Sequence, residues 1–125
     1  MKVLRTPEKQ FDTLIDWPYE PHYSEVPDGD GGTLRMHHVE SGPSDAPTVL
    51  LLHGEPTWGF LYRHIMAGLA DAGIRSLVPD QVGFGKSDKP SNQVDYTYER
   101  HVVWMQNWLD ANTPEEIFFF GQDWG

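Results

Sequence analysis

The sequence contains no cysteine, which excludes a disulfide scaffold and a thiolate metal site. Basic residues are also scarce, because nine lysines and arginines stand against nineteen aspartates and glutamates, for a net charge of −10. A surface this acidic repels phosphate groups, so neither nucleic acid nor an anionic membrane is expected as a partner. No apolar run approaches the roughly 20 residues that cross a bilayer, which argues against a membrane-spanning protein.

The first ten residues lack the apolar stretch and the small-residue cleavage site of a secretion signal, so a cytoplasmic location is expected. A length of 125 residues allows one small domain. Aromatic side chains make up 13% of the sequence, which predicts a packed core rather than disorder.

Residues 1–42 are polar and rich in turns, with several prolines and the glycine-rich run Asp28–Gly32. Within them, Thr33–Glu40 is predicted to be a short strand, although its alternation of apolar and polar residues is imperfect. This segment is typical of an edge hairpin that leads into a larger sheet.

Residues 43–125 alternate between strands and helices. Continuous apolar runs predict buried strands at Thr48–Leu52, Ile74–Val78 and Ile117–Phe120. Helical spacing predicts helices at Trp58–Ala72 and Glu99–Ala111. In the first helix the apolar residues at helical spacing are Leu61, Ile65, Leu69 and Ala72, and in the second Val102, Met105 and Leu109 lie on one face.

This order of elements predicts a parallel βαβαβ sheet with right-handed crossovers over residues 43–125, joined to edge strands and turns in residues 1–42. The sequence stops directly after the third strand, and helices normally cover both faces of such a sheet. We therefore expect residues 1–125 to be the N-terminal part of a single α/β domain that is incomplete.

Three glycine-bearing turns follow the three strands, at His53–Trp58, Pro79–Asp88 and Gly121–Gly125. Ligands bind at the carboxyl ends of parallel strands, so these turns are expected to meet at one functional edge. Gly85-Lys86-Ser87 imitates the end of a phosphate-binding loop, but Asp80 stands where that loop needs glycine, so nucleotide binding is rejected. Gly83 and Gly85 instead predict a tight turn, which Asp80 could tie down by pairing with Lys86 or Arg75.

The last turn has the spacing G-x-D-x-G, a nucleophile elbow with Asp123 in place of serine. The sharp reversal needs small residues two positions on either side, and it presents the central side chain alone above the sheet. A carboxylate is already an anion, so Asp123 suits direct attack on a carbon that bears a leaving group. The backbone N–H groups of Trp124 and Glu55 would then form the oxyanion hole for hydrolysis of the resulting ester. Spacing alone also fits a plain strand-ending turn.

The histidines are assigned more modest roles. In elbow folds the base histidine follows the nucleophile and the acid, so His53 is expected to orient its loop rather than act as base. Surface or hydrogen-bonded positions are expected for the others, which are His22, His37, His38, His64 and His101. No pair has zincin spacing, so no metal site is expected. Trp17, Trp104 and Trp108 are interpreted as core or surface-covering aromatics, and Phe118–Phe120 as strand core.

Together, the segments His53–Trp58, Pro79–Pro90 and Gln122–Gly125 resemble the haloalkane dehalogenases of the α/β-hydrolase superfamily. The resemblance also covers Arg5–Pro7 and Asp95–Thr97, so it spans nearly the whole sequence. It implies the α/β-hydrolase fold, of which this would be the N-terminal part of a mostly parallel sheet with flanking helices. The fold would stop after the nucleophile elbow, without the cap and the C-terminal core.

The resemblance implies hydrolytic dehalogenation without a cofactor, in which a small apolar haloalkane and water give an alcohol, a halide ion and a proton. Asp123 would displace the halide, and Trp124 would donate its indole N–H to the departing halide. Indole donates a hydrogen bond and accepts none, which suits an anion, so this role is favoured over that of a hydrophobic plug beside the elbow. With Glu55 directly after His-Gly, the sequence resembles the subfamily that has glutamate at this position and uses a second tryptophan from the cap.

Two alternatives remain open. An epoxide hydrolase of the same fold also uses an aspartate elbow, but Gln122 and the turn Glu55–Trp58 favour the dehalogenase. Alternatively, the product is an inactive fragment or a subunit of a split protein. The sequence holds no histidine after Asp123. We therefore expect catalytic turnover to need the remaining C-terminal part of the fold, and the 125 residues alone to show no steady turnover.

Overall fold

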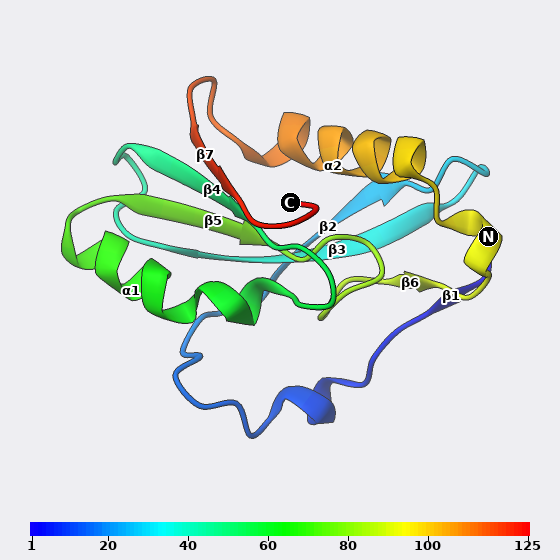
Figure 1. Ribbon diagram of the computed structural model, residues 1–125, viewed down its shortest axis with the longest axis horizontal. Coiled ribbons are helices and arrows are strands. Elements are labelled where there is room, and N and C mark those ends of the chain that lie inside the picture. Colours follow the sequence, from blue (N-terminus) through cyan, green and yellow to red (C-terminus); the bar gives the residue numbers. More distant parts are fainter.

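The computed structural model describes residues 1–125 and centres on a five-stranded sheet of order β2-β3-β5-β4-β7 (Figure 1). The bounds of these strands are His22–Pro27 for β2, Thr33–Ser41 for β3, Thr48–Leu52 for β4, Arg75–Pro79 for β5 and Phe118–Gly121 for β7. All three strands expected between residues 43 and 125 therefore form, within a residue or two of their predicted bounds.

The pairing of the strands confirms both parts of the expected sheet. β2 and β3 form an antiparallel hairpin, and β3 runs antiparallel to β5. β4 is parallel to β5 on one side and to β7 on the other. The carboxyl ends of three parallel strands thus lie at the same edge of the sheet.

Short elements tie the remaining segments to this sheet. β1 (Val3–Leu4) pairs antiparallel with β6 (Lys89–Pro90) in a separate two-stranded sheet. Two short 3-10 helices, η1 (Glu8–Phe11) and η3 (Gln93–Asp95), lie in the connecting loops. Because Lys89 and Pro90 are in a strand and open no helix, the structure agrees with the rejection of a phosphate-binding loop.

The first predicted helix is shorter than expected and turns a different face to the sheet. It consists of a 3-10 turn, η2 (Gly59–Tyr62), followed by α1 (Arg63–Asp71). Gly59, Tyr62 and Met66 are its buried residues. Of the apolar residues at helical spacing, Leu61, Ile65 and Ala72 are exposed and only Leu69 is partly buried. The 3-10 turn rotates the following residues relative to one continuous α-helix, which brings the pair four residues apart at 62 and 66 onto the sheet.

The second predicted helix forms as α2 (Tyr98–Asn112), and Thr97 caps it by accepting the N–H of Arg100 at 3.1 Å. Trp104 and Trp108 are its fully buried residues, which confirms that they belong to the core. Val102, Met105 and Leu109 share one face as predicted, but this is not the fully buried face, because Val102 is exposed while Met105 and Leu109 are partly buried. Neither α1 nor α2 is long and apolar enough to cross a membrane.

Two apolar clusters make up the core, one on each face of the sheet. The larger contains Leu34, Met36, Leu50 and the two tryptophans of α2, and the smaller contains Tyr62 and Met66 of the α1 side. β7 lies at the edge, and its residues Phe118–Phe120 are 50 to 69% exposed. The prediction that they are strand core is therefore wrong for these 125 residues, since neither helix covers the strand.

Candidate active site

The segment Gly121–Gly125 forms a sharp turn that holds Asp123 in the left-handed region, at a φ of 60°. This conformation is costly for a residue other than glycine, and it is sustained by close packing. A Cβ atom on Gly121 would meet the carbonyl oxygen of Gly125 at 2.8 Å, and one on Gly125 would collide with the carbonyl oxygen of Leu52. The two glycines are therefore required sterically, as the elbow pattern predicts.

The turn after β4 lies directly against this elbow. The backbone N–H of Glu55 donates to Oδ1 of Asp123 at 3.1 Å, and the N–H of Gln122 donates to the carbonyl oxygen of Leu52 at 3.2 Å. The Glu55 side chain itself is exposed. One predicted oxyanion-hole donor thus already faces the carboxylate of Asp123, and its other oxygen, Oδ2, has no hydrogen-bond partner among the described residues.

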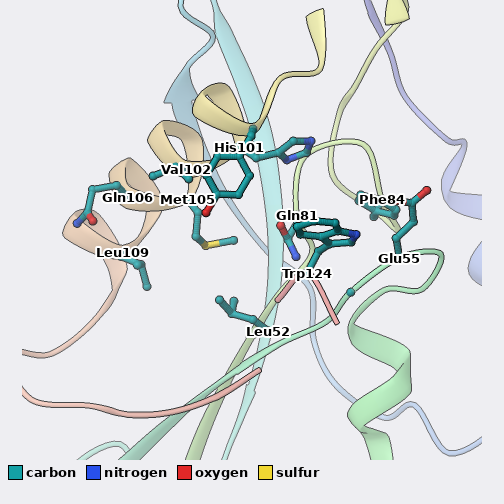
Figure 2. Close-up of a pocket in the computed structure, with 12 residues that line it drawn as sticks. Leu52, Glu55, Gln81, Phe84, His101, Val102, Met105, Gln106, Leu109 and Trp124 are labelled. Carbon is teal, nitrogen blue, oxygen red and sulfur yellow. The ribbon is translucent and has the colours of Figure 1, made fainter. Parts of the chain in front are cut away.

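Trp124 lines an open groove of about 480 Å³ at this edge of the sheet, and its side chain is 72% exposed. Figure 2 shows α2 side chains on one side of the groove, Glu55 and Phe84 on the other, and Trp124 between them. The indole is therefore not buried as a hydrophobic plug in this structure. The groove is mostly apolar, as a site for a small apolar ligand requires.

Several groove residues were not assigned a role from the sequence. They are Gln81 and Phe84 from the loop after β5, and Tyr98, His101, Val102, Met105, Gln106 and Leu109 from α2. The α2 positions recur every three or four residues, which is the spacing of one helix face. The spacing shows that these residues share one face of α2. It does not show that this face lines a groove, or that the neighbouring face of α2 packs on the sheet.

His53 is completely buried, and both of its ring nitrogens are engaged. Nδ1 lies 2.8 Å from the carbonyl oxygen of Gly54, and Nε2 accepts the backbone N–H of Gln81 at 2.9 Å. The proton is therefore on Nδ1, and burial lowers the pKa of His53, so the ring is neutral. These contacts agree with an orienting role and leave no nitrogen free to act as a base.

Asp80 ties down the glycine turn, but not through the side chains that were expected. Its buried carboxylate accepts the backbone N–H of Gly59 at 2.7 Å and of Lys86 at 2.9 Å, and it lies 2.8 Å from Nδ1 of His37. The Lys86 ammonium is instead near Glu8, and Arg75 pairs with Glu40. Gly83 and Gly85 have positive φ values, which confirms the predicted tight turn.

The remaining histidines differ in their surroundings. His22 and His64 are exposed as expected, and His37 contacts Asp80. The expectation fails for His38, which is 8% exposed, has no partner for Nδ1, and has its pKa lowered by burial to about 4. His101 is partly exposed at the surface of the groove, as the expectation allows, and its ring makes no hydrogen bond. Burial lowers the pKa of His101, while the nearby charge of Glu55 acts in the opposite direction.

A mixed sheet whose three parallel strands end at one edge, with a sharp aspartate turn after the last of them, is typical of an α/β hydrolase. Residues 47–125 match the family described as alpha/beta hydrolase fold, and the chain belongs to this family. It is similar to a haloalkane dehalogenase of Mycolicibacterium paratuberculosis, with 50% identity over the whole chain and 42% of the relative.

Solved structures give the same picture. The haloalkane dehalogenase DpaA from Paraglaciecola agarilytica NO2 matches with a TM-score of 0.90 and 39% identity, over 99% of this chain and 42% of that one. An epoxide hydrolase from Vigna radiata matches with a TM-score of 0.73 and 31% identity, over 86% of this chain and 31% of that one. The chain thus spans about two-fifths of the length of the dehalogenases it matches.

Proposed function

We propose that this chain carries the nucleophile of a hydrolytic haloalkane dehalogenase, and that the nucleophile is Asp123. The observation that carries the proposal is the contact of 3.1 Å between the Glu55 N–H and Oδ1 of Asp123, made while Asp123 sits at a φ of 60°. A strand-ending turn without a catalytic role needs neither feature. The similarity to dehalogenases over the entire chain supports the proposal.

In the first step, Oδ2 of Asp123 attacks the carbon that bears the halogen, because Oδ1 is already held by Glu55. The new bond joins Oδ2 to carbon, and the carbon–halogen bond breaks with both electrons leaving on the halide. No proton moves in this step. The indole N–H of Trp124 is proposed to stabilise the halide in the groove, where it donates without competing for a proton.

In the second step, water adds to the carbonyl carbon of the ester, so negative charge develops on Oδ1. The backbone N–H groups of Glu55 and Trp124 are proposed to stabilise this oxyanion. Collapse of this intermediate breaks the bond between the carbonyl carbon and Oδ2, and Oδ2 leaves with the alkyl group and a proton as the alcohol. The water must lose a proton to a base, and His53 is unsuitable because it is buried with both nitrogens engaged. We therefore propose that steady turnover needs a histidine and an acid supplied by residues other than these 125, as part of one α/β-hydrolase core domain.

An epoxide hydrolase is the second candidate, and the likeness to the Vigna radiata enzyme supports it. The higher TM-score and identity to the dehalogenase structure favour dehalogenation. The two chemistries differ in the leaving group, because an epoxide oxygen needs an acid donor whereas a halide needs only N–H donors.

The test is a single turnover with 1-bromobutane followed by mass spectrometry of the intact protein. We expect one butyl group on Asp123 and an equal amount of released bromide, and neither in Asp123→Asn. Asp110→Asn, which changes an exposed aspartate on α2, serves as the matched control and should react normally. Labelling by styrene oxide but not by bromobutane would favour the epoxide hydrolase, and labelling of a residue other than Asp123 would contradict both.

A further inference from the structure

Gln81 links the turn after β4 to the loop after β5 through two hydrogen bonds to the same residue. Its backbone N–H donates to Nε2 of His53 at 2.9 Å, and its side-chain Nε2 donates to the carbonyl oxygen of His53 at 2.5 Å. His53 is 0% exposed, so water cannot replace a partner that is lost. The carboxamide of Gln81 also lines the groove together with Trp124 (Figure 2).

The orientation of the Gln81 carboxamide follows from its partner. A carbonyl oxygen only accepts, so the amide nitrogen must face His53. The ring of His53 continues the connection, because its protonated Nδ1 donates to the carbonyl oxygen of Gly54 at 2.8 Å. A chain of hydrogen bonds therefore runs from Gln81 through His53 to the peptide that joins Gly54 to Glu55.

This peptide has little freedom against the elbow. A Cβ atom on Gly54 would lie 2.6 Å from the carbonyl oxygen of Gln122 and 2.8 Å from Oδ1 of Asp123. The turn and the nucleophile are thus in direct contact, and a small shift of the turn changes the distance between the Glu55 N–H and Oδ1.

We propose that Gln81 is a positioning residue for hydrolysis of the Asp123 ester, because it holds the turn that aims the Glu55 N–H at Oδ1. This inference rests on the proposed function. The negative charge on Oδ1 is larger in the tetrahedral intermediate than in the ester, so a well-aimed N–H lowers the barrier to hydrolysis. Ester formation uses the free Oδ2, so it depends less on this contact. Loss of Gln81 therefore lengthens the life of the ester more than it slows ester formation.

The matched pair of variants is Gln81→Met and Gln10→Met. Both replace a glutamine by methionine, but Gln10 is exposed on η1, outside the groove, and does not bond to the turn. The ester is formed with 1-bromobutane, the reagent is removed, and the decay of the ester is followed by intact mass. We expect a lifetime roughly tenfold to a hundredfold longer in Gln81→Met and unchanged in Gln10→Met. An unchanged lifetime in Gln81→Met, or an equal increase in both variants, would overturn the proposal.

A second variant, Gln81→Glu, separates positioning from a general loss of packing. The introduced carboxyl has nearly the shape of the carboxamide, but it can donate to the His53 carbonyl only when protonated. The ester lifetime relative to wild type at the same pH should therefore fall towards one as the pH decreases through the pKa of that carboxyl. A ratio that does not change with pH, in a variant that remains folded, would contradict the role of the donor.

A spectroscopic measurement keeps this proposal separate from the proposed function. The amide proton of Glu55 should shift in the NMR spectrum when Asp123 is changed to Asn, because its acceptor changes. In Gln81→Met the same proton should lose its hydrogen-bonded shift, whereas in Gln10→Met it should keep it. If wild type forms no ester, the proposed function fails, and this amide signal alone decides whether Gln81 positions the turn.

Discussion

Replacement of Asp80 by asparagine gives a direct test of how the turns after β4 and β5 are held at the edge of the sheet that carries Asp123. The Asp80 carboxylate is completely buried and accepts three hydrogen bonds at 2.7 to 2.9 Å. Gly59 donates to Oδ1, while Lys86 and His37 contact Oδ2. Both Gly59 and Lys86 donate through backbone N–H groups, which cannot change their role.

Asparagine has only one acceptor oxygen, so one of these two N–H groups must face an NH₂ group. If the amide nitrogen of asparagine takes the Oδ1 position, the Gly59 N–H loses its acceptor. If the nitrogen takes the Oδ2 position, the Lys86 N–H loses its acceptor. A buried donor without a partner costs about 1–3 kcal/mol, and the bonds that remain are no longer charge-assisted. We therefore expect the free energy of unfolding to fall by about 2–3 kcal/mol, which lowers the melting temperature by about 6–15 °C.

Thermal and urea unfolding, followed by circular dichroism, measure this difference. Asp110→Asn removes the same charge from an exposed site and should change the stability by less than about 0.5 kcal/mol. A loss below about 1 kcal/mol in Asp80→Asn would show that the turns do not depend on both carboxylate oxygens, and would refute the reasoning.

Two further predictions concern His38 and the elbow glycine. Burial lowers the pKa of His38 to about 4 from an ordinary 6.5, so between these pH values the unfolded chain binds a proton that the folded protein does not. Stability should therefore fall as the pH decreases through this range, by up to about 3 kcal/mol, and His38→Gln should flatten that part of a urea-unfolding pH series. A Cβ atom in Gly125→Ala would collide with the backbone of Leu52, so we expect a loss of about 1–3 kcal/mol in thermal unfolding. Gly68→Ala in α1 meets nothing within 4 Å and should stabilise by about 1 kcal/mol; equal effects of the two alanines would contradict the steric account.

The elements predicted from the sequence form because their signals are local. A continuous apolar run such as Thr48–Leu52 favours a buried strand wherever it lies, and Thr97 caps α2 through its own hydroxyl. The cap glycine Gly73 has a φ of 75°, as a helix-ending residue requires. The G-x-D-x-G spacing likewise predicts the elbow because the steric demand arises within five residues.

The buried faces could not be predicted in the same way. Leu61 and Ile65 have the correct spacing for a buried stripe, yet the sheet covers Tyr62 and Met66 instead. The three phenylalanines of β7 have the composition of a core strand, yet in these 125 residues they are exposed because neither α1 nor α2 covers the faces of β7. Burial depends on which element packs against which, and this depends on residues that are distant in the sequence.

By itself, the sequence determined the order of strands and helices, the parallel pairing, the elbow at Asp123 and the likeness to dehalogenases. Only the tertiary structure decided that the Glu55 N–H contacts Oδ1, that Gln81 holds His53 in place, and that Asp80 joins two turns through backbone donors. The physical reason is the separation along the sequence between the groups that interact. Backbone conformation is set by neighbours within a few residues, whereas these hydrogen bonds join groups that come together only when the carboxyl ends of β4, β5 and β7 meet.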